Sequence, residues 1–213
     1  TRVRSSAASD VYKRQPDGRM REGIIGTTVL YHFLSTIDYT NGALILRRKT
    51  AQQLQQFQAQ AKSAGAASMP FWMAPDHYLF AQGGVNGHGP YLFVVDTGAA
   101  GLGFVPSDAT IKDIGIQLSS SQAVTGVGTG GGALRAIPFI ASELTLGSVV
   151  RHGVRGVAGG YQDLGFGFNV AGLISHDFFR PFAVTLDFTN MRLYVAGKAP
   201  DASASAAGPA SSR

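Results

Sequence analysis

The residues of this 213-residue chain best placed to do chemistry follow an apolar strand, in the stretch YLFVVDTGAAGLGF (91–104). Five apolar side chains run directly into Asp96, and Thr97 and Gly98 follow. A carboxylate isolated behind such a strand loses hydration, so its pKa rises and it becomes a candidate general acid or base. The alternative is structural, because Asp96 could accept backbone hydrogen bonds from Thr97, Gly98 and Ala99 in an Asx-type turn. Taken alone, the triplet favours the structural alternative, since three residues match by chance too easily.

Other catalytic chemistries find little support in the sequence. The chain has no cysteine, so neither a thiol nucleophile nor a disulfide is available. It also lacks the G-x-S-x-G pattern of a serine nucleophile. Its histidines do not have H-E-x-x-H spacing, and they are His32, His77, His88, His152 and His176. We therefore expect a chemistry that needs no metal ion and no other cofactor.

Composition indicates a β-rich protein with a sizeable core. Apolar residues make up 45% of the chain and charged residues 15%, and the 28 glycines are typical of a protein with many turns. The net charge of +5 is concentrated in the leading segment and in the Arg47–Lys49 cluster. No basic stripe is interleaved with aromatic residues, and no apolar run approaches the ~20 residues of a membrane span. We therefore expect neither nucleic acid nor a membrane span as a partner.

Two segments of the chain repeat each other without a gap. GIIGTTVLYHFLSTIDYTNGALIL (23–46) aligns with GLISHDFFRPFAVTLDFTNMRLYV (172–195) at a constant offset of 149. Each copy predicts an apolar strand end, a short helical stretch and a hairpin that turns at Asp-aromatic-Thr-Asn, so Asp38 and Asp187 are interpreted as turn formers. The identical pairs are Gly23/Gly172, Ile25/Ile174, Phe33/Phe182, Thr36/Thr185, Asp38/Asp187, Thr40/Thr189, Asn41/Asn190 and Leu44/Leu193. This pattern predicts an internal duplication.

The duplication predicts that the chain holds the tail of one unit and all of a second. A helix between them is expected to be capped by Thr50, with Leu54, Phe57 and Ala61 on one face. We predict five segments along the chain: a non-native or disordered leader (1–21), the C-terminal remnant of the first unit (22–47), a linker helix (48–69), a complete second unit (70–197) and a disordered tail (198–213).

In context, these motifs resemble the retropepsin-like aspartic protease family. The resemblance rests on the strand YLFVV, then DTGA, then GLGFVP before a short helix, and on the unit ending GLISHDFFRPFAVTLDF, which the first copy repeats. It implies an all-β fold, a retropepsin-like closed barrel with one short helix, preceded by a partial sister lobe and a linker helix. It assigns Asp96, Thr97 and Gly98 to the catalytic triplet. Ser175 departs from the family, which usually has glycine there, whereas the first copy keeps Gly26.

The resemblance implies an aspartic-type endopeptidase in which paired aspartates activate a water. Thr97 would brace the opposing loop, and Gly98 would allow close packing. The sequence holds no second Asp-Thr-Gly, so the partner aspartate would come from a missing N-terminal lobe or from a homodimer partner. Without it the fragment would be inactive. The alternative is a catalytically inactive module that binds a peptide or another ligand. For the location of the protein, the resemblance suggests a periplasmic or secreted setting.

The glycine-rich stretch VTGVGTGGGAL (124–134) has three interpretations. It fits the G-x-G-x-x-G nucleotide fingerprint formally, but a strand pattern follows it instead of a helix, and no acid lies about 20 residues on. It could be a flexible loop. In the protease interpretation it is a flap that closes over a peptide or protein substrate. The predicted substrate-binding residues of the flap and active loop are Ala99, Val124, Gly126, Val127 and Gly128.

Overall fold

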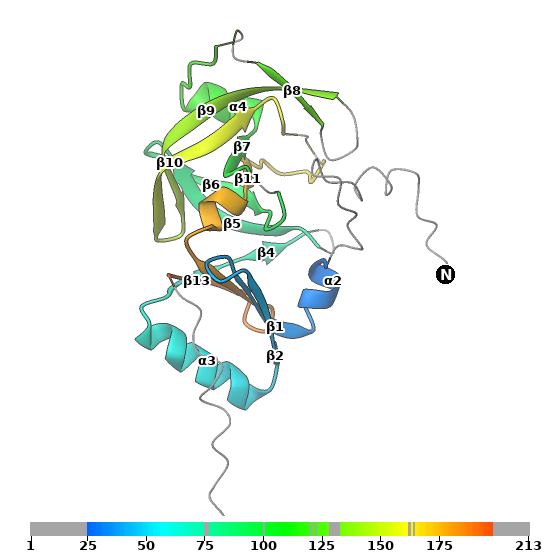
Figure 1. Ribbon diagram of the computed structural model, residues 1–213, viewed down its shortest axis with the longest axis vertical. Helices are drawn as coiled ribbons and strands as arrows, with labels where there is room; N and C mark the ends of the chain where they lie inside the picture. Colours follow the sequence, from blue (N-terminus) through cyan, green and yellow to red (C-terminus); the bar gives the residue numbers. More distant parts are fainter. Residues whose placement is uncertain are drawn as a thin grey trace, which may run out of the picture.

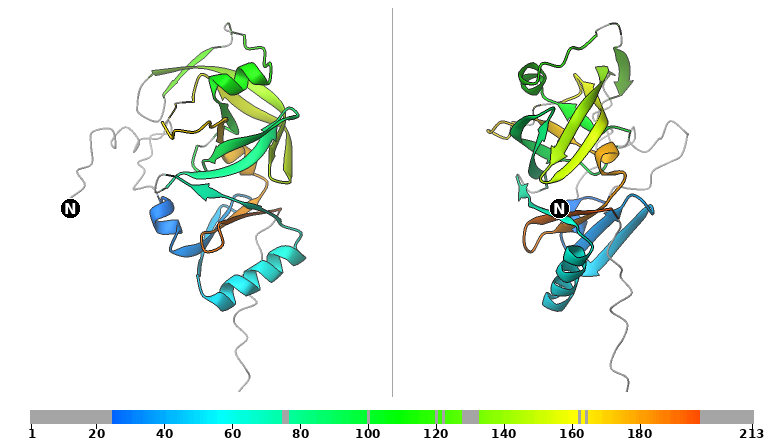
Figure 2. Two further views of the ribbon diagram at one scale, coloured as in Figure 1. Left: turned by 180° about the vertical axis from the view of Figure 1, so that it is seen from behind. Right: turned by 90° about the vertical axis from the view of Figure 1, so that its left-hand side faces the viewer.

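The computed structural model describes residues 25–197, apart from 75–76, 100, 120, 122, 128–132, 162 and 164. The predicted leader (1–21) and tail (198–213) therefore lie outside the described residues. The described chain is mostly β-strand with few helices, as the sequence predicted (Figure 1). Its strands form two sheets, one of eight strands and one of five, which lie one above the other in Figures 1 and 2.

The eight-stranded sheet carries the predicted catalytic loop. Its order is β4-β5-β6-β11-β7-β10-β9-β8, and β5 also pairs with β9. Six strands are thereby joined in a ring of pairings, from β5 through β6, β11, β7, β10 and β9 back to β5. The strands are β4 (Trp72–Met73), β5 (Leu79–Val85), β6 (His88–Val95), β7 (Phe104–Pro106), β8 (Val124–Val127), β9 (Ala133–Leu146), β10 (Val149–Ala158) and β11 (Gly172–Ile174).

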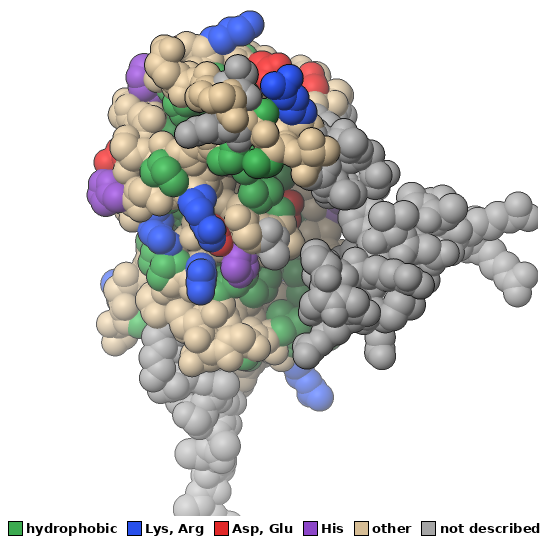
Figure 3. Space-filling view, turned by 45° about the horizontal axis from the view of Figure 1, so that its top comes forward, with side chains coloured by type: hydrophobic (Ala, Val, Ile, Leu, Met, Phe, Trp, Pro, Cys, Tyr) green, Lys and Arg blue, Asp and Glu red, His purple; other side chains and the backbone are tan. Residues whose placement is uncertain are grey.

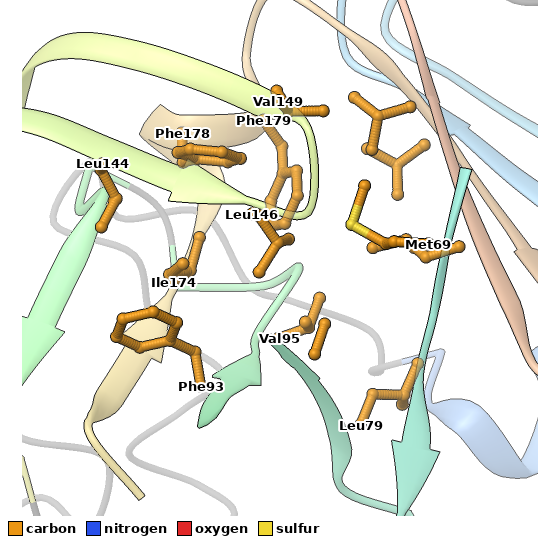
Figure 4. Packing of buried hydrophobic residues seen from close by; sticks show 14 of the residues in the cluster. Met69, Leu79, Phe93, Val95, Leu144, Leu146, Val149, Ile174, Phe178 and Phe179 are labelled. Atoms are coloured by element: carbon orange, nitrogen blue, oxygen red, sulfur yellow. The ribbon is translucent and has the colours of Figure 1, made fainter. Parts of the chain in front are cut away.

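The main hydrophobic core lies inside this ring and continues down to the five-stranded sheet. Figure 4 shows buried side chains from several strands pointing toward one another, together with two from helix α5 (His176–Phe179). The short helix α4 (Asp108–Asp113) lies at its margin, and Ser107 caps it by accepting a hydrogen bond from the Thr110 amide. Members of the core that are almost fully buried include Phe93, Phe104, Leu144, Leu146, Ile174, Phe178 and Phe179.

The five-stranded sheet combines both repeats. Its order is β2-β1-β12-β13-β3, and all its pairings are antiparallel. Helix α3 (Ala51–Ser63) packs under one face through Leu54, Phe57 and Ala61, which are buried as predicted, and Thr50 caps it. The strands are β1 (Phe33–Asp38), β2 (Ala43–Arg48), β3 (Ala67–Pro70), β12 (Ala183–Asp187) and β13 (Arg192–Ala196). The helix is shorter than the expected segment, because the chain joins the sheet as β3 at Ala67.

The repeated segments have the same local structure. Helix α2 (Thr27–Leu30) and helix α5 occupy equivalent positions at the offset of 149. Asp38 closes its turn by accepting hydrogen bonds from Thr40 and Asn41, and Asp187 does the same with Thr189 and Asn190. Both acids are therefore turn formers, as the sequence predicted.

The two repeats meet at a local twofold axis. Strands β1 and β12 pair antiparallel with Thr36 opposite Thr185, and the two Oγ1 atoms are 2.7 Å apart. Because these two threonines are equivalent in the repeat, a rotation that exchanges them also exchanges β1 with β12 and β2 with β13. The first copy thus takes the place beside β12 that a symmetry-related unit would occupy.

Candidate active site

Asp96 begins a loop at the end of the buried strand β6. Strand β11 runs parallel to β6 and pairs Ile174 with Val95, and the Asp96 amide continues this pairing by donating to the Ile174 carbonyl at 2.9 Å. Strand pairing therefore fixes the backbone on which the carboxylate sits. The Asp96 side chain is half-buried, and its Oδ1 accepts a hydrogen bond of 2.8 Å from the Gly98 amide. The Asx-type turn foreseen as the structural alternative is thus present, on a carboxylate that keeps contact with solvent.

Ser175 holds this loop through its side-chain hydroxyl. Its side chain is fully buried, and its Oγ lies 2.7 Å from the Asp96 carbonyl oxygen and 3.0 Å from that of Ala99. One hydroxyl proton is thereby shared between two carbonyls of the loop. A glycine could not supply this contact, so the departure from the resembled family has a physical role here.

Tyr39 reaches the same loop from the first repeat. Its hydroxyl donates to the Thr97 carbonyl at 2.8 Å, and its ring packs on His176 and Phe179. Burial raises the pKa of Tyr39, and the charge of Asp96 raises it further, so the phenol remains a proton donor. Sequence reasoning missed this residue. The signal was the exchange of Tyr39 for Phe188 in the repeat, since only the first copy has a hydroxyl there.

A charged network fastens the helix behind the loop. Arg155 donates through Nε and Nη2 to Oδ2 of Asp177, at 3.0 and 2.6 Å, and the His176 ring lies 3.3 Å from Oδ1. Arg151 donates to the Phe178 carbonyl at 2.9 Å. The His176–Asp177 pair therefore joins α5 to β10.

An open hollow of about 700 Å³ lies beside the stretch that follows the loop. Its walls combine apolar side chains with the Arg155 guanidinium. The lining residues are Gly101, Leu102, Ile116, Gln117, Ser119, Pro138, Phe139, Ile140, Arg155, Gly156 and Val157. Asp96, Thr97, Gly98 and Ala99 do not line it, so this hollow flanks the predicted catalytic residues and does not contain them.

The predicted flap is a β-hairpin within the described residues. Strand β8 pairs antiparallel with the start of β9, from Val124 opposite Ala136 to Val127 opposite Ala133, and Gly126 lies within β8. Val124 is exposed. Gly128 lies outside the described residues. The structure thus gives the backbone pairing of the hairpin, while the substrate contacts predicted for it stay a prediction.

Charged side chains of both signs lie on the face shown in Figure 3. On this face, several Lys and Arg side chains lie beside acidic ones, and hydrophobic side chains group between polar ones.

Among the described residues, no three His, Cys, Asp or Glu side chains cluster in a way that could hold a metal ion. Within the same part of the chain, no helix combines the length and apolar character needed to cross a membrane.

In this β-rich lobe, a buried strand ends in a half-buried aspartate. Ser175, from a later strand–helix unit, holds the loop of that aspartate. This arrangement is the class of site that an aspartic protease has. Comparison with known proteins agrees, since residues 81–175 match the family model described as an aspartyl protease. Over residues 81–175 the chain is therefore similar to the aspartyl protease family.

One solved structure similar to this chain is a retropepsin-like aspartic protease from Rickettsia conorii. It is 16% identical, with a TM-score of 0.45, and the alignment covers 61% of this chain and 90% of that one. Among curated proteins no relative was found.

Proposed function

We propose that this chain supplies one half of an aspartic-type endopeptidase, with Asp96 as one of two carboxylates that activate a water. The observation that carries the proposal is the placement of Asp96. It is half-buried at the end of β6, on a loop whose backbone is fixed by Ser175 and Tyr39. A loop fixed in this way keeps the reacting carboxylate in position, so the loop does not need to rearrange during the reaction.

The chemistry is general acid–base hydrolysis. Two carboxylates a few ångström apart share one proton, because both cannot ionise at that distance. The ionised carboxylate takes a proton from a bound water, whose oxygen attacks the peptide carbonyl carbon, while the protonated one donates to the carbonyl oxygen. Collapse of the tetrahedral intermediate then breaks the C–N bond as the leaving nitrogen takes a proton.

The second carboxylate is proposed to come from a lobe related to this one by the local twofold axis at Thr36 and Thr185. The symmetric pairing of β1 with β12 supports this, because rotation about that axis carries the Asp96 loop to a position on the other side of it. Residues 22–47 are then the C-terminal remnant of that first lobe, and residues 70–197 are the complete second lobe.

An extended peptide is proposed as the substrate, lying between the Asp96 loop and the flap. The flap residues Val124, Gly126, Val127 and Gly128 would close over it and Ala99 would line its path, excluding water from the reaction. The hollow beside Leu102 and Phe139 supports a pocket for an apolar side chain of the peptide.

A tandem chain tests the proposal. A copy of residues 67–173 is fused directly before Ile25. Because Ile25 is equivalent to Ile174 in the repeat, the copied lobe continues into the first repeat just as the original lobe continues into the second. We expect this tandem to cleave a peptide library, and Asp96→Asn in both lobes to reduce kcat/KM at least ~10³-fold. Asp108→Asn removes an exposed acid on α4 and serves as the control, with no expected effect. Cleavage that survives Asp96→Asn in both lobes would refute the catalytic role of Asp96, and peptide binding without cleavage would favour the alternative of a non-catalytic peptide-binding module.

A further inference from the structure

The peptide group between Thr97 and Gly98 takes part in two hydrogen bonds at once. Its carbonyl oxygen accepts a bond of 2.8 Å from the Tyr39 hydroxyl. Its N–H donates a bond of 2.8 Å to Oδ1 of Asp96. The Tyr39 hydroxyl, this peptide group and the Asp96 carboxylate therefore form one continuous series of hydrogen bonds, which we call the Tyr39 relay.

A peptide group transmits polarisation from its oxygen to its N–H. Its C–N bond has partial double-bond character, so a proton donor at the oxygen draws electron density away from the nitrogen. Hydrogen bonds in series strengthen one another by about 10–30% per bond. The Tyr39 hydroxyl therefore strengthens the bond from the Gly98 amide to Asp96. That bond is stronger to an ionised carboxylate than to a neutral carboxyl group, so the relay favours the ionised form.

The Tyr39 hydroxyl is a fixed proton donor. Burial raises the pKa of Tyr39 and the charge of Asp96 raises it further, so the phenol keeps its proton. The ring is held by His176 and Phe179, whose ring centroids lie 5.4 and 6.3 Å from its own. The hydroxyl is therefore held in its direction toward the Thr97 carbonyl.

Ser175, the other side chain that holds the loop, acts on different peptide groups. Its Oγ lies 2.7 Å from the Asp96 carbonyl oxygen and 3.0 Å from that of Ala99. Neither carbonyl belongs to the peptide group between Thr97 and Gly98. Ser175 therefore holds the same loop as Tyr39 without belonging to the relay, and the two contributions can be separated by substitution.

The repeat restricts the relay to one of the two proposed active loops. Phe188 is the equivalent of Tyr39 at the offset of 149. The twofold axis at Thr36 and Thr185 exchanges the strands that lead into these two residues. A loop on the other side of the axis would thus face Phe188, which has no hydroxyl proton to donate. Two equivalent carboxylates would then have unequal hydrogen-bond support.

We propose that Tyr39 makes Asp96 the ionised member of the aspartate pair, the one that takes the proton from water. The other carboxylate holds the shared proton and donates it to the peptide carbonyl oxygen, while the water oxygen forms the new bond to the carbonyl carbon. This inference rests on the proposed function and deepens it, because it assigns the two roles within the pair. Tyr39 touches neither water nor peptide and is a positioning residue.

Other charged groups lie around Tyr39 and the loop. Asp38 precedes Tyr39 in its turn. From α5, His176 packs on the Tyr39 ring and lies 3.3 Å from Oδ1 of Asp177, which Arg155 of β10 also contacts. All of these groups remain in a Tyr39→Phe protein. Since His176 touches the ring directly, each measurement below is repeated in a His176→Gln background, where the effect of Tyr39→Phe should persist.

The amide proton resonance of Gly98 in the natural chain tests the relay itself. Tyr39→Phe should move this resonance upfield at neutral pH, because the bond to the ionised carboxylate weakens while the aromatic ring stays in place. Ser175→Ala is the matched control, since it loosens the loop at other carbonyls and should move the resonance much less. A resonance that does not move on Tyr39→Phe would overturn the proposal. Equal movement in both variants would overturn it too, because loosening of the loop would then explain the effect.

The pH dependence of kcat/KM in the tandem chain tests the assignment of roles. Its acidic limb reports the first proton lost from the aspartate pair as a whole. Tyr39→Phe should move this limb to higher pH by about 0.2–0.6 unit, because the ionised form loses support. Ser175→Ala should lower activity without moving the limb. An acidic limb that Tyr39→Phe leaves in place would refute the assignment.

Exchanging the two aromatic residues tests the asymmetry. In the tandem, Phe188→Tyr added to Tyr39→Phe gives the hydroxyl to the other loop, so the acidic limb should return toward its original position. A limb that stays at the Tyr39→Phe position would contradict the asymmetry.

The relay and the proposed function fail differently. A tandem that cleaves through Asp96 with a limb insensitive to Tyr39→Phe would refute the assigned roles and leave the protease proposal standing. A Gly98 resonance that responds to Tyr39→Phe, in a chain whose tandem cleaves nothing, would leave the relay standing and refute the catalytic proposal.

Discussion

At the scale of single residues, the loop of Asp96 depends on two side chains that do no chemistry themselves. Tyr39 donates to the Thr97 carbonyl and comes from the first repeat, so the hairpin of one unit positions the active loop of the other. Under the twofold axis its counterpart is Phe188, which has no hydroxyl. The two active loops of the proposed enzyme therefore differ in their support.

Tyr39→Phe tests this support. The ring should still pack on Phe179, because Phe188 is accommodated at the equivalent site. We expect the tandem to lose kcat by about five- to tenfold with little change in KM, and the amides of residues 97–99 to exchange faster, since one hydrogen bond worth about 1 kcal/mol is removed. Tyr194→Phe, under the opposite face against Phe57, is the control. Unchanged exchange in the loop would contradict a positioning role.

Ser175→Ala tests the other support. The hydroxyl is fully buried, and its removal leaves the Asp96 and Ala99 carbonyls without this donor. We expect the free energy of unfolding to fall by about 1–3 kcal/mol, measured by urea denaturation of the natural chain. Ser121→Ala, at an exposed serine, should have no measurable effect. A Ser175→Ala protein as stable as the parent would show that the loop does not depend on this contact.

At the scale of elements, the hairpin turn at Asp38 makes stability depend on pH. Burial of Asp38 raises its pKa, but hydrogen bonds from Asn41 and Thr40 outweigh burial and hold the pKa below its ordinary value. Because the folded pKa lies below the unfolded one, Asp38 stabilises the fold above about pH 4 and loses this contribution as the pH falls through the folded value.

Urea denaturation between pH 2 and 6 measures this effect. The free energy of unfolding should decrease below about pH 4, and Asp38→Asn should make that decrease smaller. Asp163→Asn, at an exposed loop acid, should leave the profile unchanged. A profile that Asp38→Asn does not alter would assign the acid sensitivity to other carboxylates.

Some of these elements could be predicted from the sequence because their causes are local. Thr50 and Ser107 cap helices, Leu54, Phe57 and Ala61 form a helical stripe, and each Asp-aromatic-Thr-Asn makes its own turn. The sequence does not indicate strand β3, most of which falls in the expected linker segment (48–69), because a four-residue strand is set by its partner β13 and not by its own pattern. The hydrogen bond from Tyr39 to Thr97 was missed for a similar reason, since it joins residues 58 apart through the pairing of the repeats.

At the scale of the whole molecule, the two repeats differ in how deeply their equivalent side chains are buried. Leu193 and Val195 are core, while Leu44 and Leu46 at the same structural positions are about 40% exposed. We therefore propose that Asp96 acts only together with a second aspartate, which another lobe brings across the Thr36–Thr185 axis.

Peptide hydrolysis by single-lobe variants of the tandem chain tests this claim most directly. Asp96→Asn placed in either lobe alone should abolish cleavage as completely as Asp96→Asn in both, and the natural chain at the same concentration should show no Asp96-dependent cleavage. Cleavage by the natural chain as a strict monomer, lost on Asp96→Asn, would contradict the claim, because one aspartate would then suffice.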